Sequence, residues 1–325
     1  MMNLKVGIIG VGHLGRIHLQ QWLQIDGVDL VGFFDPFDEN ASKAIEMGAS
    51  RFNSVEELIL ASDAIDIVST TTAHYELACL ALKHKKHVFI EKPITHTLEE
   101  ANQLLTLINQ AGVKGQVGHV ERFNPGFLSI KDYTLNPMFI ECHRLAQFNP
   151  RGTDVSVILD LMIHDIDIIL SVVNSKVINV AASGVAVVSE SLDIANARLE
   201  FENGCVANIT ASRMALKKMR KIRFFQKDAY IGIDFLEKKS EICRLSDSAH
   251  QNDWAIPLEI PNQTTRYIHF EAPAVVDSNA IRTELSMFRD AILRDTPTPV
   301  SFQDGYNALL VATEIYEQII RKQKN

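Results

Sequence analysis

The sequence of 325 residues is poor in several features that mark particular classes of protein. Its four cysteines, Cys79, Cys142, Cys205 and Cys243, are scattered and form no CxxC pair, which is typical of reduced thiols in a cytoplasm. The formal net charge of −8 argues against a nucleic-acid partner. No apolar run is long enough to cross a bilayer, and the N-terminus lacks the layout of a signal peptide. We therefore expect a cytoplasmic protein without a nucleic-acid or membrane partner.

The first 120 residues alternate between strand-like and helix-like patterns. Apolar residues make up 46% and charged residues 22%, as in ordinary globular proteins, and the length favours two domains. Strands are expected at 4–9, 28–34, 65–70, 87–90 and 113–117. Helices are expected at 13–25, 39–47, 55–61, 74–84 and 98–111. This alternation predicts an α/β domain over residues 1–120, with a Rossmann-type, doubly wound parallel sheet.

The pattern changes after Asn124-Pro125, where we expect a second domain over residues 121–325. Helices are predicted near 155–173, 278–294 and 304–323. Strand-like segments follow one another at 177–188, 195–201, 205–211, 221–225, 229–234 and 241–245. Asn203-Gly204 predicts a hairpin turn between two of them. Successive strands predict an α+β domain with a large, mostly antiparallel open sheet. Because such a sheet must cover its apolar face, we expect a homodimer or homotetramer.

The most informative motif is Gly10-x-Gly12-x-x-Gly15, which lies between the first strand and the first helix. Gly10 permits a tight turn, Gly12 lets a pyrophosphate approach the backbone, and Gly15 lets the helix pack closely on the strand. The N–H groups at the start of the helix then face the anion. The predicted loop contacts of the dinucleotide are Gly10, Gly12, His13, Leu14 and Gly15.

An acidic residue follows this motif at the distance expected for a ribose ligand. Asp35 ends the second predicted strand and lies 35 − 15 = 20 residues after Gly15. A carboxylate there accepts ribose hydroxyls and repels a 2′-phosphate. The adjacent Pro36, Phe37 and Asp38 supply no cation to offset that repulsion, so we expect NAD rather than NADP.

Two further segments carry residues suited to proton chemistry. Lys92 follows a predicted strand, at the sheet edge where ligands of open α/β sheets bind, and it could hydrogen-bond a substrate hydroxyl. The Lys92-Pro93 bond is a candidate for a cis peptide. Asp160 and His164 are spaced i, i+4 on one helix face, so His164 could act as a general base oriented by Asp160. The alternatives are a solvated lysine at a strand end, and a helix cap beside a buried histidine. A metal site is not expected.

Taken together, these motifs closely resemble the glucose-fructose oxidoreductase / inositol dehydrogenase (Gfo/Idh/MocA) family. The resemblance also rests on the string from Thr70 to Tyr75 and on Asp304-Gly305-Tyr306-Asn307-Ala308-Leu309, and it covers essentially the whole chain. It implies an NAD-dependent dehydrogenase in which Lys92 hydrogen-bonds the reacting hydroxyl and His164 accepts its proton. The catalytic set that it implies is Lys92, Asp160 and His164. The cofactor-lining positions that it implies are Thr70, Thr71, Thr72, His74 and Glu91.

Two strings narrow the substrate. Residues 118–125 and residues 151–164 resemble the forms found in members that act on UDP-N-acetylglucosamine, the 3-dehydrogenases. A cluster of cations suits the diphosphate of such a substrate, although a solvated basic face would look the same. The members of the cluster are Arg213, Lys217, Lys218, Arg220, Lys221, Arg223 and Lys227. The further substrate candidates are Arg144, Arg151, His119 and Arg122, the last two with an interdomain brace as the alternative.

Three functions remain open from the sequence. The leading one is an NAD-dependent dehydrogenase acting on C3 of a UDP-N-acetylhexosamine. The second is a dehydrogenase of a free polyol or sugar such as inositol, which would need no cation cluster. The third is a non-catalytic dinucleotide-binding regulator, against which the joint presence of Lys92, Asp160 and His164 argues.

Overall fold

The computed structural model of the chain describes residues 3–149, 155–248, 255–259 and 264–323. The chain divides into two compact units, one of Met1–Val120 with Asn279–Leu310 and one of Glu121–Ser278 with Val311–Asn325. The sequence prediction had assigned 279–310 to the second domain. No helix among the described residues is long and apolar enough to span a bilayer.

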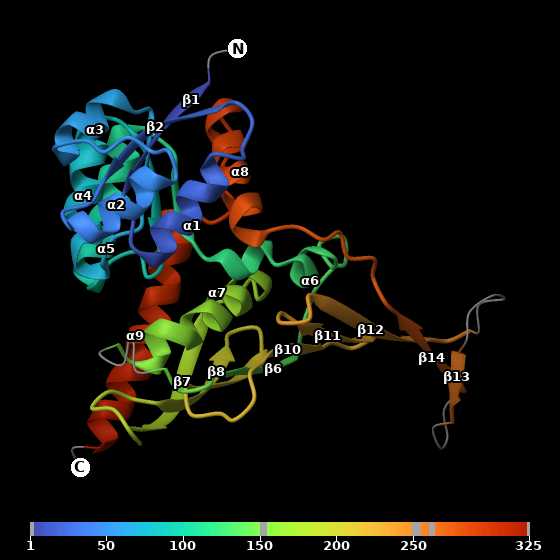
Figure 1. The fold of residues 1–325 in the computed structure, drawn as a ribbon. Coiled ribbons are helices and arrows are strands. Elements are labelled where there is room, and N and C mark those ends of the chain that lie inside the picture. Colours follow the sequence, from blue (N-terminus) through green and yellow to red (C-terminus); the bar gives the residue numbers. More distant parts are fainter. Residues whose placement is uncertain (1–2, 150–154, 249–254, 260–263, 324–325) are drawn as a thin grey trace. The chain divides into compact units, whose positions relative to one another are not determined.

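The first unit is built on a five-stranded parallel sheet in the order β2-β1-β3-β4-β5. Helices α4 and α5 pack together, as do α1 and α8 (Figure 1). The elements of this unit are β1 (Leu4–Ile9), α1 (His13–Trp22), β2 (Val28–Phe34), α2 (Asp38–Glu46), α3 (Val55–Ala61), β3 (Ala64–Ile67), α4 (Thr71–Lys83), β4 (His87–Glu91), α5 (Leu98–Ala111), β5 (Gly115–Gly118) and α8 (Ala280–Leu293). Two further elements, η1 (Val120–Phe123) and α9 (Phe302–Gln323), contribute residues to both units.

Helix α8 belongs to the first unit because its apolar face packs into that unit's core. Leu285 and Phe288 are fully buried beside Trp22 of α1, and the Arg282 guanidinium donates to the side chain of Gln21 at 3.0 Å. These contacts join segments more than 250 residues apart in the chain. The sequence pattern identifies such a helix but does not show which sheet it covers.

The second unit holds a nine-stranded sheet in the order β13-β14-β12-β11-β10-β6-β9-β8-β7. The β6–β9 pairing is parallel, and the other pairings between described strands are antiparallel. Its elements are α6 (Pro125–Leu128), β6 (Phe139–Leu145), η2 (Ile158–Met162), α7 (Ile163–Val172), β7 (Val177–Val185), β8 (Ile194–Phe201), β9 (Val206–Ser212), β10 (Met219–Phe225), β11 (Ala229–Asp234), β12 (Lys239–Ser246), β13 (Ala255–Leu258) and β14 (Arg266–Glu271).

Helices cover one face of this sheet, and on the other face, the open face, the side chains of the described strands are mostly half-exposed. Helix α7 packs on β6 and β9, and the π-turn η2 packs on β9. Helix α6 lies beside β11 and β12 (Figure 1). Ile140 and Cys142 of β6 are buried on the covered face, and the residues between and around them are half-exposed. The same alternation in β8 and β9 gives the sheet one apolar face.

The predicted fold class is confirmed in both parts: a parallel α/β sheet and a large, mostly antiparallel sheet. The strands at 4–9, 28–34 and 229–234 and the helices at 55–61 and 98–111 match to the residue. The hairpin turn is confirmed, since β8 and β9 pair across Gly204, whose φ is +86°. Strands β6, β13 and β14 were not predicted.

Candidate functional site

The glycine loop joins β1 to α1 at the carboxyl edge of the first sheet. Gly10 has a φ of +91°, a left-handed conformation that favours glycine. A Cβ atom at Gly15 would lie 2.0 Å from the carbonyl oxygen of Gly10, so the loop and helix can approach this closely only with glycine there. A Cβ atom at Gly12 would meet no heavy atom within 4 Å. No side chain of the described residues caps the start of α1, where N–H groups suit an anion.

A cleft of about 480 Å³ opens beside this loop. Its walls come from the carboxyl ends of β1, β2 and β3 and from α2, α3 and α4. The predicted cofactor residues in its lining are Gly10, Gly12, His13, Leu14, Asp35 and Thr70. Phe37, Val55 and Leu77 add an apolar wall that the sequence did not predict. This combination of bare backbone, a carboxylate and an apolar wall fits the adenosine and pyrophosphate of a dinucleotide.

Asp35 lies at the end of β2 and turns its carboxylate toward the loop. Oδ2 accepts the N–H of Val11 at 2.8 Å, and Oδ1 accepts the N–H of Phe37 at 2.9 Å. The side-chain amide of Asn40 donates to both oxygens, at 3.4 and 3.3 Å. These bonds hold the carboxylate in the cleft wall, where it can accept ribose hydroxyls.

Arg51 is a cation near this carboxylate that the sequence did not reveal. It lies beside β2 because Phe33 and Arg51 form an isolated parallel bridge. Its guanidinium donates to the Asp35 carbonyl oxygen at 2.9 Å and pairs with the Asp38 carboxylate at 2.7 Å. The pairing with Asp38 offsets the positive charge of Arg51, so the expectation that Asp35 selects against a 2′-phosphate stays a prediction that this cation does not remove.

The segment 70–74 opens helix α4 after β3, and its members have different surroundings. Thr70 precedes the helix and lines the cleft. His74 is buried, with ring nitrogens 3.0 Å from the Pro93 carbonyl oxygen and 3.2 Å from that of Ser69. Burial lowers the pKa of His74, although both carbonyls favour its charged form. His74 therefore ties the loop after β3 to the loop after β4, rather than lining the cleft.

Glu91 and Lys92 lie where β4 ends. The Glu91 carboxylate is buried, accepts the backbone N–H of Lys92 at 3.2 Å, and faces His18 at the same distance. Lys92 is half-buried, and the Lys92–Pro93 peptide is cis, as predicted. Because the carboxyl ends of parallel strands share one edge of a sheet, Lys92 lies at the same edge as the glycine loop.

In the second unit, Asp160 and His164 lie on two kinds of helical turn. The predicted continuous helix is instead the π-turn η2, which holds Asp160, followed by α7, which holds His164. The N–H of Ile163 bonds the carbonyl oxygen of Ile158, five residues back. The wider turn changes the angle between the two side chains relative to an α-helix. Single π-turns inside helices occur often at functional sites.

Two other carboxylates of α7 hold arginines inside the second unit. Arg144 of β6 is 2% exposed and donates to both Asp165 oxygens, at 3.0 and 2.8 Å, and to Glu121 at 2.7 Å. Burial opposes its charge, but the Asp165 and Glu121 carboxylates raise the pKa of Arg144. Arg122 donates twice to Asp167, at 2.7 Å each. The sequence favours both arginines as substrate ligands, but these internal ion pairs explain their presence without a substrate.

The basic segment 213–227 is less available for a diphosphate than its sequence suggests. Arg213 is 5% exposed, so the prediction that it contacts a phosphate does not fit its burial. Four of the seven cations pair with Asp193 (Arg213, 3.9 Å), Glu121 (Arg220, 3.3 Å), Asp234 (Lys221, 3.1 Å) and Glu141 (Arg223, 3.5 Å). Lys217 and Lys218 are exposed in the loop between β9 and β10. These two lysines are the cations of this loop whose side chains stay exposed.

Two other substrate candidates receive no support from position. His119 is 1% exposed where β5 ends, and its backbone N–H donates to the Val117 carbonyl oxygen at 2.8 Å. Arg151 lies outside the described residues. No group of three His, Cys, Asp or Glu side chains among the described residues could hold a metal ion.

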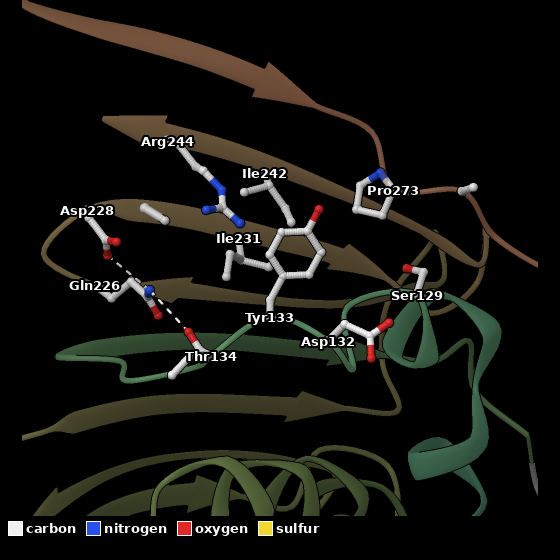
Figure 2. Close-up of a pocket in the computed structure, with 12 residues that line it drawn as sticks. Ser129, Asp132, Tyr133, Thr134, Gln226, Asp228, Ile231, Ile242, Arg244 and Pro273 are labelled. Carbon is white, nitrogen blue, oxygen red and sulfur yellow. Dashed lines mark hydrogen bonds between the residues drawn. The ribbon is translucent and has the colours of Figure 1, made fainter. Parts of the chain in front are cut away.

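The second unit also contains a cavity of about 560 Å³ that the sequence did not predict. Figure 2 shows Arg244, Tyr133, Ile231 and Ile242 near one another in its lining. The Arg244 guanidinium lies over the ring of Tyr133, at 4.9 Å from its centroid. The Tyr133 hydroxyl donates to Glu271 at 2.9 Å. Of the described residues that line this cavity, none is a predicted site residue. We therefore keep it apart from the proposed reaction site.

The fold and the cleft define an NAD-binding oxidoreductase. Residues 4–119 match the profile of the oxidoreductase family with an NAD-binding Rossmann fold, and residues 134–230 match the GFO/IDH/MocA C-terminal domain. The chain belongs to the Gfo/Idh/MocA family of dehydrogenases, which confirms the resemblance drawn from its motifs. This membership, together with Lys92, Asp160 and His164, assigns the chain to the enzymes rather than to non-catalytic regulators.

Individual relatives span nearly the whole chain. It is 34% identical to the UDP-N-acetylglucosamine 3-dehydrogenase of Acidithiobacillus ferrooxidans, over 97% of each chain. A solved structure of that enzyme superposes with a TM-score of 0.88 at 32% identity, covering 98% of each chain. The chain is also 27% identical to the myo-inositol 2-dehydrogenase of Thermotoga maritima, over 95% of this chain and 94% of that protein.

Proposed function

We propose that the protein oxidises the C3 hydroxyl of a UDP-linked N-acetylhexosamine, with NAD⁺ as the hydride acceptor. The observation that carries this proposal is the similarity to a UDP-N-acetylglucosamine 3-dehydrogenase over 97% of both chains. Residues 118–125, whose form resembles such enzymes, support it. A second candidate is oxidation of a free polyol, which the similarity to a myo-inositol 2-dehydrogenase favours.

The first unit would hold the cofactor through groups of different chemistry. Gly10 and Gly12 offer backbone to the pyrophosphate, and Asp35 accepts the ribose hydroxyls. Thr70 lines the same cleft. When bound, NAD⁺ supplies the nicotinamide carbon C4 that receives the hydride. Lys92, at the same edge of the sheet, donates a hydrogen bond from Nζ to the reacting hydroxyl.

The second unit would supply the proton acceptor. His164 takes the proton of the reacting hydroxyl as hydride leaves the same carbon, because imidazole titrates near neutral pH. Asp160 orients His164 or holds a neighbouring hydroxyl of the sugar. The proposed chemistry needs both Lys92 and His164 to act on a single hydroxyl. The family resemblance supports these three roles.

Recognition of the nucleotide would depend on cations that the fold leaves exposed. Lys217 and its neighbour Lys218 have ammonium groups at the surface between β9 and β10. Each could donate to a diphosphate oxygen, as a charge-assisted hydrogen bond. A free polyol has no charge for them to recognise, so this pair distinguishes the two candidate substrates.

A substrate screen tests the proposal. The purified protein is incubated with NAD⁺ and either UDP-N-acetylglucosamine, UDP-N-acetylgalactosamine, free N-acetylglucosamine or myo-inositol, and the reduced nicotinamide is followed by absorbance. We expect turnover of a UDP-sugar, with the product oxidised at C3 by NMR. Turnover of inositol without that of any UDP-sugar would establish the second candidate instead.

We also propose that two or four copies associate through the open face of the nine-stranded sheet, and that they do so in a cytoplasm. The rings of Phe139, Phe225 and Tyr230 form a cluster on this face, at centroid distances of 6.0 and 5.3 Å. The four cysteines are free thiols, as suits a reducing compartment. Light scattering should give a dimer or tetramer mass, and Phe225→Glu should lower it.

A further inference from the structure

The first unit contains a buried histidine for which the proposed reaction has no use. His18, on α1, is fully buried. Its Nδ1 lies 2.9 Å from Asp66 Oδ2, and its Nε2 lies 3.2 Å from Glu91 Oε1. The indole N–H of Trp22 also donates to Asp66 Oδ2, at 2.7 Å. The carboxylates come from adjacent strands, β3 and β4, and the ring of Phe89 packs edge-on to the imidazole.

Two buried carboxylates beside the ring favour an imidazolium: Nδ1 has hydrogen-bond geometry to Asp66, and Nε2 approaches Glu91 at ion-pair distance without that geometry. A neutral imidazole has one N–H, which would donate to Asp66 and leave the second ring nitrogen as a lone pair facing the Glu91 carboxylate. Burial disfavours the charge, but the Asp66 carboxylate and then Glu91 outweigh it and raise the pKa of His18 well above its ordinary value. The pKa of Glu91 is lowered despite burial, because of His18 and the charge of Lys92. The titratable groups facing His18 are thus Asp66 from β3 and Glu91 from β4.

Glu91 connects this cluster to the strand end that carries Lys92. One carboxylate oxygen faces His18, and the other accepts the backbone N–H of Lys92 at 3.2 Å. The neighbouring strand leaves room for this arrangement, because Gly118 of β5 pairs with Glu91. A Cβ atom at Gly118 would lie 2.5 Å from Glu91 Oε1. The carboxylate is therefore held between a cation and the backbone of Lys92.

We propose that His18 is a positioning residue that acts on Lys92 through Glu91. This rests on the proposed function, in which Lys92 contacts the reacting hydroxyl. With the imidazolium present, the charge of Glu91 is offset and its carboxylate is held against the Lys92 backbone. Without it, the charge of Lys92 is what remains to offset the buried Glu91 carboxylate, and the carboxylate then favours the protonated, less reactive form of the Lys92 amine. Helix α1 starts at the glycine loop, so the same cluster links that loop to the Lys92 end of β4.

The test measures the reactivity of the Lys92 amine without cofactor or substrate. Isotopically labelled formaldehyde with a borane reductant methylates only the neutral amine, and peptide mass spectrometry gives the rate at Lys92 at a fixed pH near 8. His18→Gln should slow this rate about three- to tenfold, the effect of one charge on a nearby group. Trp22→Phe is the matched control, since it removes another donor to Asp66 but leaves Glu91 paired with His18.

A double-mutant cycle shows whether the effect passes through Glu91. Glu91→Gln removes the carboxylate charge and should speed the labelling of Lys92. Adding His18→Gln to that variant should then change the rate little. The proposal is wrong if His18→Gln leaves the rate at the wild-type value, if Trp22→Phe slows it as much, or if His18→Gln acts equally in the Glu91→Gln background. If His18→Gln does not fold, the Glu91→Gln variant decides alone: a labelling rate at Lys92 equal to the wild-type rate would overturn the proposal.

Turnover provides a second readout. In the UDP-sugar assay, His18→Gln should lower kcat about tenfold while the Kd for NAD⁺ and the KM for substrate change little, since a positioning error affects the transition state. Unchanged kcat would contradict the proposal. If the wild-type protein turns over no sugar, the proposed function fails, whereas the labelling rates still decide the link between His18 and Lys92.

Discussion

At the scale of single residues, Asp35 is the group expected to select the cofactor. Replacing it with Ala removes the acceptor of the ribose hydroxyls and the charge that repels a 2′-phosphate. We expect kcat/KM for NAD⁺ to fall about 10- to 100-fold, the cost of one or two hydrogen bonds to a charged group, while the value for NADP⁺ holds or rises. Steady-state kinetics with both cofactors measure the ratio.

Glu39 offers the control for Asp35. It is a nearby carboxylate whose ion pair is with Lys43 of the same helix. Glu39→Gln should leave the cofactor ratio unchanged. If the ratio of kcat/KM for NAD⁺ to that for NADP⁺ changes as much in Glu39→Gln as in Asp35→Ala, the cofactor preference comes from the overall charge around α2 and not from Asp35 itself.

His18 makes a prediction about pH and stability. Because its folded pKa is raised, its ion pairs contribute fully below the unfolded value of about 6.5, and the contribution is lost as pH rises through the folded pKa. The melting temperature of the wild-type protein should therefore fall more between neutral and alkaline pH than the melting temperature of His18→Gln does. Trp22→Phe should keep the wild-type slope. If the melting temperatures of wild type and His18→Gln change equally with pH, His18 is not charged in the folded protein.

At the scale of elements, the glycine loop gives two substitutions with opposite expectations. Gly15→Ala places a methyl group 2.0 Å from the Gly10 carbonyl oxygen and should cost more than about 3 kcal/mol of unfolding free energy. Gly12→Ala meets no atom within 4 Å and should change stability by less than about 1 kcal/mol. It should still weaken NAD⁺ binding about tenfold, because the methyl group occupies the approach of the pyrophosphate.

Chemical denaturation and calorimetric titration separate the two effects. If the glycine loop binds the pyrophosphate, Gly12→Ala should fold normally but bind NAD⁺ more weakly. Full NAD⁺ affinity in Gly12→Ala would place the pyrophosphate elsewhere in the cleft.

A second pair of substitutions concerns Arg144, which pairs with Asp165 of helix α7, and Lys217, in the loop before β10. Arg144→Ala leaves the Asp165 carboxylate buried without its ion-pair partner, and leaves Glu121 with Arg220 alone, so it should cost about 3–5 kcal/mol of stability. The Lys217 side chain is exposed, so Lys217→Ala should change the free energy of unfolding by less than about 0.5 kcal/mol. It should instead raise the KM for a UDP-sugar about tenfold and leave any turnover of a free sugar unaffected. A stable Arg144→Ala with weakened UDP-sugar binding would restore Arg144 as a phosphate ligand.

At the scale of the whole molecule, chemistry and cofactor binding belong to different sets of residues. Lys92→Ala and His164→Ala should each lower kcat by about 10²- to 10⁴-fold, the usual range for general acid–base catalysis. His164 lies outside the unit that holds the cleft, so its variant should bind NAD⁺ nearly as wild type. Unchanged turnover in both variants would show the catalytic assignment to be wrong.

The sequence by itself determined the parts of this protein that depend on adjacent residues. Turn geometry follows from the glycines at 10, 12 and 15, strand and helix boundaries follow from periodicity, and the position of Asp35 follows from chain spacing. Lys92 was placed at the cofactor edge because the carboxyl ends of parallel strands share that edge. These features need no knowledge of distant contacts.

The tertiary structure decided whatever depends on which distant charges meet. Strand β6 escaped prediction because Arg144 interrupts its apolar face, and only the folded chain brings Asp165 and Glu121 to neutralise it. Ion pairs with distant carboxylates also occupy the arginines of the basic segment 213–227, so these arginines are less available to bind a substrate. His18 lies in the predicted helix 13–25, where the local pattern does not distinguish it from its neighbours. It becomes a candidate for positioning Lys92 only because β3 and β4 bring two carboxylates to it, and burial makes their charges strong.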